Sequence, residues 1–228
     1  MAARRLDEAT WPEVAALDRP VLVVPLGSTE QHGPHLPLGT DTLIAEAISK
    51  RVADARPSFV LGPTISIGAS GEHAGFAGTL SIGTPVLSSV LLELSRSARA
   101  SFRAVLVISA HGGNRSALRT AAARARADGD LLLGFEPHLV GADAHAGHTE
   151  TSLLLALAPS LVRHDEVVTG TTTPIEELAE ALTTSGVIAV STSGVLGDPT
   201  AATHEHGEEL LDVIVTQALA HVDRELVA

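Results

Sequence analysis

Short apolar runs alternate with helical patterns along this chain, and this alternation constrains its fold more than any other feature. The runs are continuous and rich in Val, Leu and Ile, which is typical of strands buried on both faces of a sheet. We expect strands over residues 21–26, 59–67, 105–109 and 131–136, the second of them broken by Gly62 and Pro63. Strands that alternate with helices predict a layered α/β domain, with helices on both faces of a mostly parallel sheet.

Helical patterns fill the intervals between these strands. Helices are expected over residues 41–55, 85–101, 115–128, 153–157, 174–184 and 205–226. The last is the clearest, because its apolar residues recur at spacings of three and four. Thr40 is a candidate N-cap of the first helix, and residues 187–191 are a candidate late strand.

Size and composition narrow the class of protein. The chain has 228 residues, 45% of them apolar, which is enough for one sizeable core, and we expect a single domain over residues 1–228. Its net charge of −12 argues against nucleic-acid binding, which needs a basic face. Because the chain has no cysteine, disulfides, zinc–thiolate sites, iron–sulfur clusters and cysteine nucleophiles are excluded. No signal-peptide pattern or membrane-spanning run is visible, so we expect a cytoplasmic location and no membrane partner.

Residues 25–41 are the stretch with the most potential chemistry. They carry Glu30, His32, His35 and Asp41 among glycines and prolines, which exclude a continued helix or strand and predict a shaped loop. Carboxylates and imidazoles are ligands of zinc, manganese and non-haem iron. Glu30 and His32 would point the same way from an extended backbone, and a helix N-terminus favours the ionised form of Asp41. The competing interpretation is a polar surface turn with capping residues.

Two further polar clusters directly follow strands. One begins at His111, and the other comprises His138, Asp143, His145, His148 and Glu150. In open α/β sheets, ligands gather beyond the carboxyl ends of the strands, so parallel strands would bring all these clusters to one edge. This convergence predicts a metal site. Two alternatives remain open: residues 111–114 as a turn with an Asn cap, and residues 143–150 as a helix N-terminus capped by Thr149 and Glu150.

The residue types suggest hydrolysis at such a site. Glu150 is a candidate ligand, His145 a candidate acid–base group, and His148 a candidate solvated loop residue. Serine hydrolysis and nucleotide binding are disfavoured, because the chain lacks a Gly-x-Ser-x-Gly elbow and a phosphate-binding glycine pattern. Two cations that share a bridging carboxylate lower the pKa of a shared water and stabilise an oxyanion, which suits amide hydrolysis.

Several segments together resemble the creatininase family. They are residues 30–37 (EQHGPHLP) with Asp41, residues 111–114 (HGGN) and residues 150–152 (ETS), and the likeness runs from about residue 21 to the last helix. The resemblance implies a metal-dependent amidohydrolase with a three-layer α/β/α fold, usually a homo-oligomer. Residues 68–73, 145–152 and 194–200 are similar to a narrower subgroup, which releases the C-terminal Val–Tyr-derived unit of a modified precursor peptide.

The resemblance also implies roles for individual residues. It assigns five ligands of two divalent cations: Glu30, His32, Asp41, His111 and Glu150. Asp41 would bridge the cations, with Glu30 and His111 completing one site and His32 and Glu150 the other. Zinc, iron(II) and manganese all remain candidates.

Further roles follow for the acid–base group and the substrate cleft. His145 matches the family's acid–base histidine, and the loop at 68–83 should line the cleft through Ser70, Glu72 and His73. One position departs from the pattern: creatininase has a glutamate ligand two residues after the histidine that matches His111, and this chain has Gly113 there. The second cation site therefore depends on Glu150.

Three hypotheses about function follow. In the first, the chain is a peptidase in which metal-bound hydroxide attacks an amide of the modified precursor peptide and His145 protonates the leaving nitrogen. In the second, it is a family relative that acts on a cyclic amide or a formamide. In the third, it is a metal-stabilised scaffold that presents the peptide without cleaving it. An open coordination position favours catalysis over the scaffold.

Overall fold

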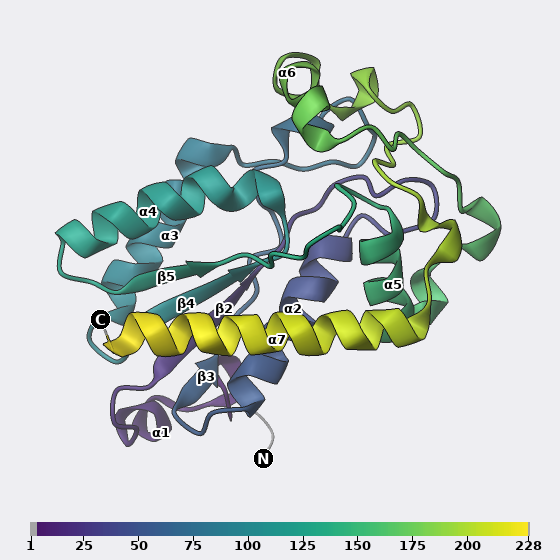
Figure 1. Cartoon of the computed structure of the whole chain (residues 1–228). Coiled ribbons are helices and arrows are strands. Elements are labelled where there is room, and N and C mark those ends of the chain that lie inside the picture. Colours follow the sequence, from purple (N-terminus) through teal and green to yellow (C-terminus); the bar gives the residue numbers. More distant parts are fainter. Residues whose placement is uncertain (1–3, 228) are drawn as a thin grey trace.

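A computed structural model describes residues 4–227, which build a parallel sheet of five strands in the order β1-β3-β2-β4-β5. The strands are β1 (Arg4–Arg5), β2 (Val21–Leu26), β3 (Phe59–Leu61), β4 (Ala104–Ser109) and β5 (Leu132–Phe135). β2 lies at the centre, and β4 pairs with it along its full length, from Val21 opposite Ala104 to Leu26 opposite Ser109. The carboxyl ends of β2, β4 and β5 therefore face the same edge of the sheet (Figure 1).

Helices cover both faces of this sheet, which confirms the expected α/β/α sandwich (Figure 1). They are α1 (Trp11–Ala15), α2 (Thr40–Asp54), α3 (Thr84–Ala98), α4 (Arg115–Ala127), α5 (His148–Leu157), α6 (Ile175–Ser185) and α7 (His204–Val227). Successive residues of β2 point to opposite sides. Val21 and Val23 pack in one core with α2, α5 and α7, whereas Leu22 and Val24 pack in the other with α3 and α4.

The central helix α2 shows why these elements form where they do. Ile44, Ile48 and Val52 recur every fourth residue and bury one face of the helix against the sheet. The predicted N-cap at Thr40 was wrong, because the helix already includes this residue and Gly39 holds the cap position. The Thr40 hydroxyl donates instead to the carbonyl of Pro37, 2.7 Å away, and closes the turn that precedes the helix.

Two predicted elements differ from the structure. The strand expected at 59–67 ends at Leu61, because Gly62 and Pro63 break the pairing and Pro63 has no N–H to donate. The late strand expected at 187–191 is wrong: this segment forms a short 3₁₀ helix, Val187–Ala189. It follows α6 directly through Gly186 and has no neighbouring strand to pair with in the described part of the chain. Apolar β-branched residues alone therefore did not specify a strand there.

α6 and the segments around it lie over the carboxyl edge of the sheet (Figure 1). None of the residues of α6 is buried, so this helix lies on the surface and contributes little to the hydrophobic core. Within residues 4–227, no helix has the length and apolar character needed to cross a membrane.

Candidate metal centre

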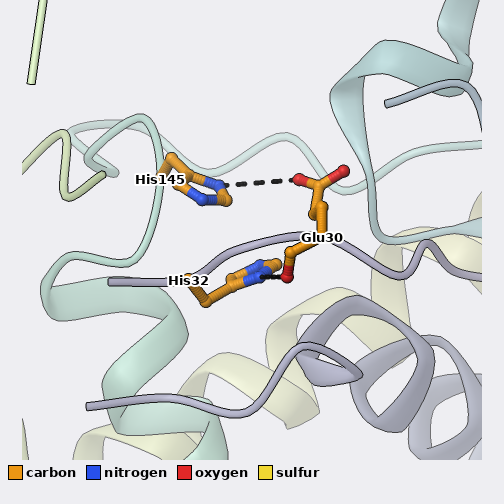
Figure 2. Close-up of side chains that lie close together, drawn as sticks. All are labelled: Glu30, His32 and His145. Atoms are coloured by element: carbon orange, nitrogen blue, oxygen red, sulfur yellow. Dashed lines mark hydrogen bonds and ion pairs between the residues drawn. The ribbon is translucent and has the colours of Figure 1, made fainter. Parts of the chain in front are cut away.

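The loop between β2 and α2 brings three expected ligands together. Glu30 and His32 lie on this loop and Asp41 in the first turn of α2, and all three side chains are buried. Nδ1 of His32 lies 3.1 Å from the backbone carbonyl oxygen of Glu30 (Figure 2), and Nε2 lies 3.1 Å from Oδ1 of Asp41. When the carbonyl accepts the Nδ1 proton, Nε2 presents a lone pair toward Asp41, which is how a metal-binding histidine is oriented.

His111 reaches the same carboxylates from the end of β4. Its Nδ1 lies 3.1 Å from Oε1 of Glu30 and 3.4 Å from Oδ2 of Asp41. Its Nε2 lies 3.3 Å from the carbonyl oxygen of Ala69, which can accept a proton there and leave the lone pair on Nδ1. Asp41 therefore directs one carboxylate oxygen to each of two histidines from different parts of the chain.

Glu150 approaches from the opposite side, in the first turn of α5. Its Oε2 lies 3.7 Å from Nε2 of His32 and accepts a hydrogen bond from the N–H of Ala146 at 2.6 Å. Ala146 is fully buried and has a φ of +52°, a left-handed conformation that a non-glycine residue adopts only when its surroundings hold it there. This strained turn aims the Ala146 N–H at the Glu150 carboxylate.

Asp143 holds the turn in place. Its carboxylate accepts hydrogen bonds from the backbone N–H groups of His148 and Thr149, the latter at 3.0 Å, and so caps α5. A Cβ at Gly147 or Gly197 would overlap with the Asp143 carboxylate, so only glycine fits at either position. The alternative of a helix N-terminus at 143–150 is correct in part, because α5 begins at His148 and Glu150 accepts the N–H of Ala146. Asp143, and not Thr149, accepts the first N–H groups of the helix.

The five expected ligands thus meet as two groups that share Asp41. Within each group the candidate ligand atoms lie within 4.8 Å of one another. These two groups are Glu30, Asp41 and His111, and His32, Asp41 and Glu150. A third group of candidate ligands among the described residues comprises Glu30, His32 and His145 (Figure 2). A carboxylate common to two such groups is the arrangement in which a bridging ligand holds two cations.

The buried Glu30 carboxylate fits a cation better than it fits the protein alone. Neither of its oxygens accepts a hydrogen bond of normal geometry from the described residues, although the side chain is fully buried. Its near neighbours are imidazole nitrogens, Nδ1 of His111 at 3.1 Å and Nε2 of His73 at 3.2 Å, and a buried carboxylate is strongly unfavourable unless it is paired in this way. Burial opposes its ionisation, but the nearby imidazoles of His111 and His73 outweigh burial and hold the pKa of Glu30 well below its usual range. The carboxylate is therefore ionised and ready to bind a cation.

The histidines of the two groups bind protons tightly when no cation is present. Burial disfavours the charged imidazole of His32, but the carboxylates of Asp41 and Glu150 outweigh it and raise its pKa to about 10. The same balance, with Glu30 as the main partner, raises the pKa of His111 to about 9. A positive charge is thus stabilised at both positions, whether a proton or a cation supplies it.

Gln31 organises two more imidazoles beside the ligands. The backbone carbonyl oxygen of Gln31 lies 2.7 Å from Nε2 of His145, and its side-chain Nε2 lies 2.9 Å from Nδ1 of His73. Nδ1 of His145 then faces Glu30 and Glu150, 3.9 Å from an oxygen of each (Figure 2 shows the Glu30 side). Burial and the neighbouring charged imidazoles hold the pKa of His145 well below its ordinary value, so this ring is neutral.

A cleft of about 830 Å³ opens onto this cluster. His111, His145 and Glu150 lie at its base, and α6 with the segment after it forms the opposite wall. Glu72 and His73, two of the expected substrate contacts, line the cleft. The third, Ser70, is fully buried and is not among the residues that line the cleft.

Glu72 also occupies the space beside Gly113. Its Oε1 lies 3.5 Å from Nε2 of His111, on the side of the ring that faces away from Asp41. A Cβ at Gly113 would overlap with Nε2 of His111 and lie 2.5 Å from both the Ala69 carbonyl oxygen and Glu72 Oε1. No side chain fits at Gly113, so a carboxylate ligand cannot stand there in this backbone.

The structure adds residues that sequence reasoning missed. Ser28 donates a 2.6 Å hydrogen bond to Oδ2 of Asp41, and Gln31 and Asp143 position the histidines and the helix described above. Ser28 and Gln31 lie beside Glu30 and His32 in the sequence, and this proximity could have indicated that they contact the site. Asp143 was part of the polar cluster named from the sequence, but its role as the cap of α5 was not predicted. His35 belongs to a different contact, 2.9 Å from the Thr151 hydroxyl.

Comparison with known proteins identifies similar chains. The sequence profile of the creatininase family, described as creatinine amidohydrolase, matches residues 7–222. The mycofactocin precursor peptide peptidase of Mycolicibacterium smegmatis is 47% identical over 211 residues, which cover 90% of this chain and 85% of that protein. Other mycobacterial proteins of the same name are 44% identical.

Solved structures agree with the sequence comparison. A manganese form of creatininase superposes with a TM-score of 0.76 at 28% identity, covering 98% of both chains. A creatininase variant of the Zn-Zn type superposes with a TM-score of 0.79 at 28% identity, covering 99% of this chain and 98% of the other.

Proposed function

This chain belongs to the creatininase family, and we propose that it is a dinuclear metal-dependent peptidase that cleaves the mycofactocin precursor peptide. The observation that carries this proposal is the pair of ligand groups sharing Asp41 at the base of an open cleft. Relatives at 44–47% identity bear the name of that peptidase. We further propose that the peptide loses its modified C-terminal Val–Tyr-derived unit.

The proposed ligand assignment follows the distances. Glu30 and His111 would hold one cation, His32 and Glu150 the other, and Asp41 would bridge them through its two oxygens. When bound, the cations would lower the pKa of a shared water and stabilise negative charge on the oxygen of an attacked amide. The manganese and Zn-Zn forms of creatininase support these metals as candidates, and iron(II) is also compatible with oxygen and nitrogen ligands.

His145 is the proposed acid–base group. In the tautomer that carries its proton on Nε2, the Gln31 carbonyl oxygen at 2.7 Å accepts this proton, and Nδ1 can accept another on the side that faces Glu30 and Glu150. A neutral imidazole in this position can take a proton from the attacking water and pass it to the leaving amide nitrogen. Because burial lowers the pKa of His145, its protonated ring is a strong acid and readily gives its proton to the leaving amide nitrogen.

Glu72 and His73 are the proposed substrate contacts from the loop at 68–83. Both line a cleft of about 830 Å³, which is large for a small cyclic amide and suits a peptide end. A second candidate function is hydrolysis of creatinine or another cyclic amide, which the description of the matching family profile favours. The size of the cleft supports the peptide over this alternative.

Parallel assays with metal-loaded protein test the proposal. The modified precursor peptide, creatinine and formamide are each incubated with the protein, and products are identified by mass spectrometry. We expect cleavage of the peptide near its C-terminus and little turnover of the small amides. Turnover of creatinine alone would replace the proposed substrate by the second candidate. Tight peptide binding without cleavage, with both cations measured in place, would favour the scaffold hypothesis.

A further inference from the structure

A second groove, of about 790 Å³, lies beside the cleft. Residues of α4 and α7 form its walls, and β5 with the residues that follow it forms its floor (Figure 1). Leu118, Arg119 and Ala122 recur on one face of α4, which shows that a single helix face lines this wall. β5 is the last strand of the sheet, so the groove lies at the sheet edge.

The groove carries positive charge on a strongly acidic protein. The chain has a net charge of −12, yet the charged residues that line the groove are Arg115, Arg119, Arg224 and Glu136. Arg115 and Glu136 form an ion pair at 2.7 Å. Arg119 and Arg224 are exposed and have no ion-pair partner among residues 4–227. Two unpaired guanidinium groups therefore face the groove from opposite walls, which is the pattern expected for an acidic partner.

The groove adjoins the cleft at Arg115. Arg115 lines both of them, at the start of α4 and directly after the segment that carries His111. The side chains of Arg115 and Glu136 mark the boundary between the cleft and the groove. Arg115 is largely exposed, so a peptide can cross this ion pair without a change in the fold of the protein. When the C-terminal end of a peptide lies in the cleft, the upstream part of that peptide must extend out of it. The boundary at Arg115 and Glu136 leads from the cleft to the unpaired arginines.

We propose that this arginine groove (Arg115, Arg119 and Arg224) binds an acidic segment of the precursor peptide upstream of the cleaved bond. The inference rests on the proposed peptidase function and adds a binding site for the part of the substrate that is not released. Arg119 and Arg224 pair with carboxylates of the segment, while the metal centre holds the C-terminal unit. Such exposed pairs act mainly on binding and depend on salt.

Kinetics on two substrates test the groove. Arg119→Glu, Arg224→Glu and the double variant are assayed with the full-length modified precursor and with a short peptide that carries the same C-terminal unit. For the full-length substrate we expect KM to rise roughly tenfold in the double variant with kcat nearly unchanged, which corresponds to about 1.4 kcal/mol. KM for the short peptide should stay at the wild-type value. Arg103→Glu, an exposed arginine before β4, is the matched charge-reversal control.

Direct binding separates the groove from the proposed function. A labelled upstream segment without its C-terminal unit is titrated into the metal-loaded protein, and the double variant should weaken its binding roughly tenfold. If the precursor is never cleaved but this segment binds through the arginines, the proposed peptidase function is wrong and the proposed binding role of the groove is supported. If cleavage is normal and both substrates respond equally to the variants, or not at all, the groove proposal is wrong. A changed oligomeric state with unchanged KM would instead identify the groove as a contact between copies of this chain.

Discussion

The backbone carbonyl of Gln31 lies 2.7 Å from Nε2 of His145, although 114 residues separate them in the chain. The side chain of Gln31 is 3.0 Å from the same nitrogen and also donates to the carbonyl of Gly194. One residue between two proposed ligands thus fixes the ring that faces them. The site is therefore organised by its buried neighbours as much as by the ligands themselves.

Gln31→Leu tests this positioning role. We expect kcat to fall about 10- to 100-fold, because His145 and His73 lose their contacts with the side-chain amide of Gln31. The backbone carbonyl of residue 31 still contacts His145, and the bound metal content and KM should change little. Steady-state kinetics and elemental analysis measure both quantities. Unchanged kcat with fully loaded protein would show that the ring is oriented without Gln31.

Asp41→Asn tests the bridging carboxylate. An amide cannot offer two anionic oxygens to two cations, so we expect the metal content to fall and activity to drop by about 100-fold or more. Asp212→Asn, on the exposed side of α7, is the control and should behave as wild type. Full activity of Asp41→Asn with two cations still bound would contradict the proposed mechanism.

Metal removal tests the coupling between the site and stability. Three carboxylates, Glu30, Asp41 and Glu150, meet in the ligand groups, so chelation should leave them facing one another and lower stability. A cation at 100 times its Kd contributes about 2.7 kcal/mol, which corresponds to a Tm change of roughly 5–10 °C for a chain of this length. Calorimetry with and without chelator, followed by re-addition of zinc or manganese, measures this effect. The Asp41→Asn variant should show a much smaller response.

Gly113→Ala tests the close packing beside His111. Its Cβ would overlap with the His111 ring and crowd Glu72, so we expect a loss of about 1–3 kcal/mol in stability together with lower activity. Gly112→Ala is a matched control, because a Cβ there meets nothing within 4 Å. Chemical denaturation of both variants gives the comparison. Equal stability of the two would show that the backbone at 113 relaxes freely.

His35 provides a test of pH dependence. Burial and the nearby charge of His32 lower the pKa of His35 to about 4, whereas an unfolded histidine titrates near 6.5. Between these values the unfolded chain binds more protons, so stability falls as pH drops from about 6.5 to about 4. His35→Gln should flatten this part of the stability curve, measured by denaturation at several pH values. His164→Gln, at an exposed position, should leave the slope unchanged.

The sequence by itself determined the layered fold and indicated which side chains gather at the edge of the sheet. Apolar runs such as Val21–Leu26 can only be buried on both faces, so the parallel sheet followed from local pattern. The candidate ligands Glu30, His32 and Asp41 lie within twelve residues, on the loop after β2 and in the first turn of α2. The rule that parallel strands end at one edge predicted that His111 and Glu150 would meet them. Short-range pattern and topology together were enough for these features.

Only the tertiary structure decided what surrounds the ligands. The contacts of Gln31 with His145 and of Asp143 with Gly197 join residues that lie far apart in the chain, where no local periodicity records them. The left-handed conformation of Ala146 and the burial of Ser70 have no local sequence signal either. The segment at 187–191 shows the same limit, since β-branched residues form a strand only where a neighbouring strand is available to pair. The arginine groove likewise exists only because α4 and α7 lie on either side of β5.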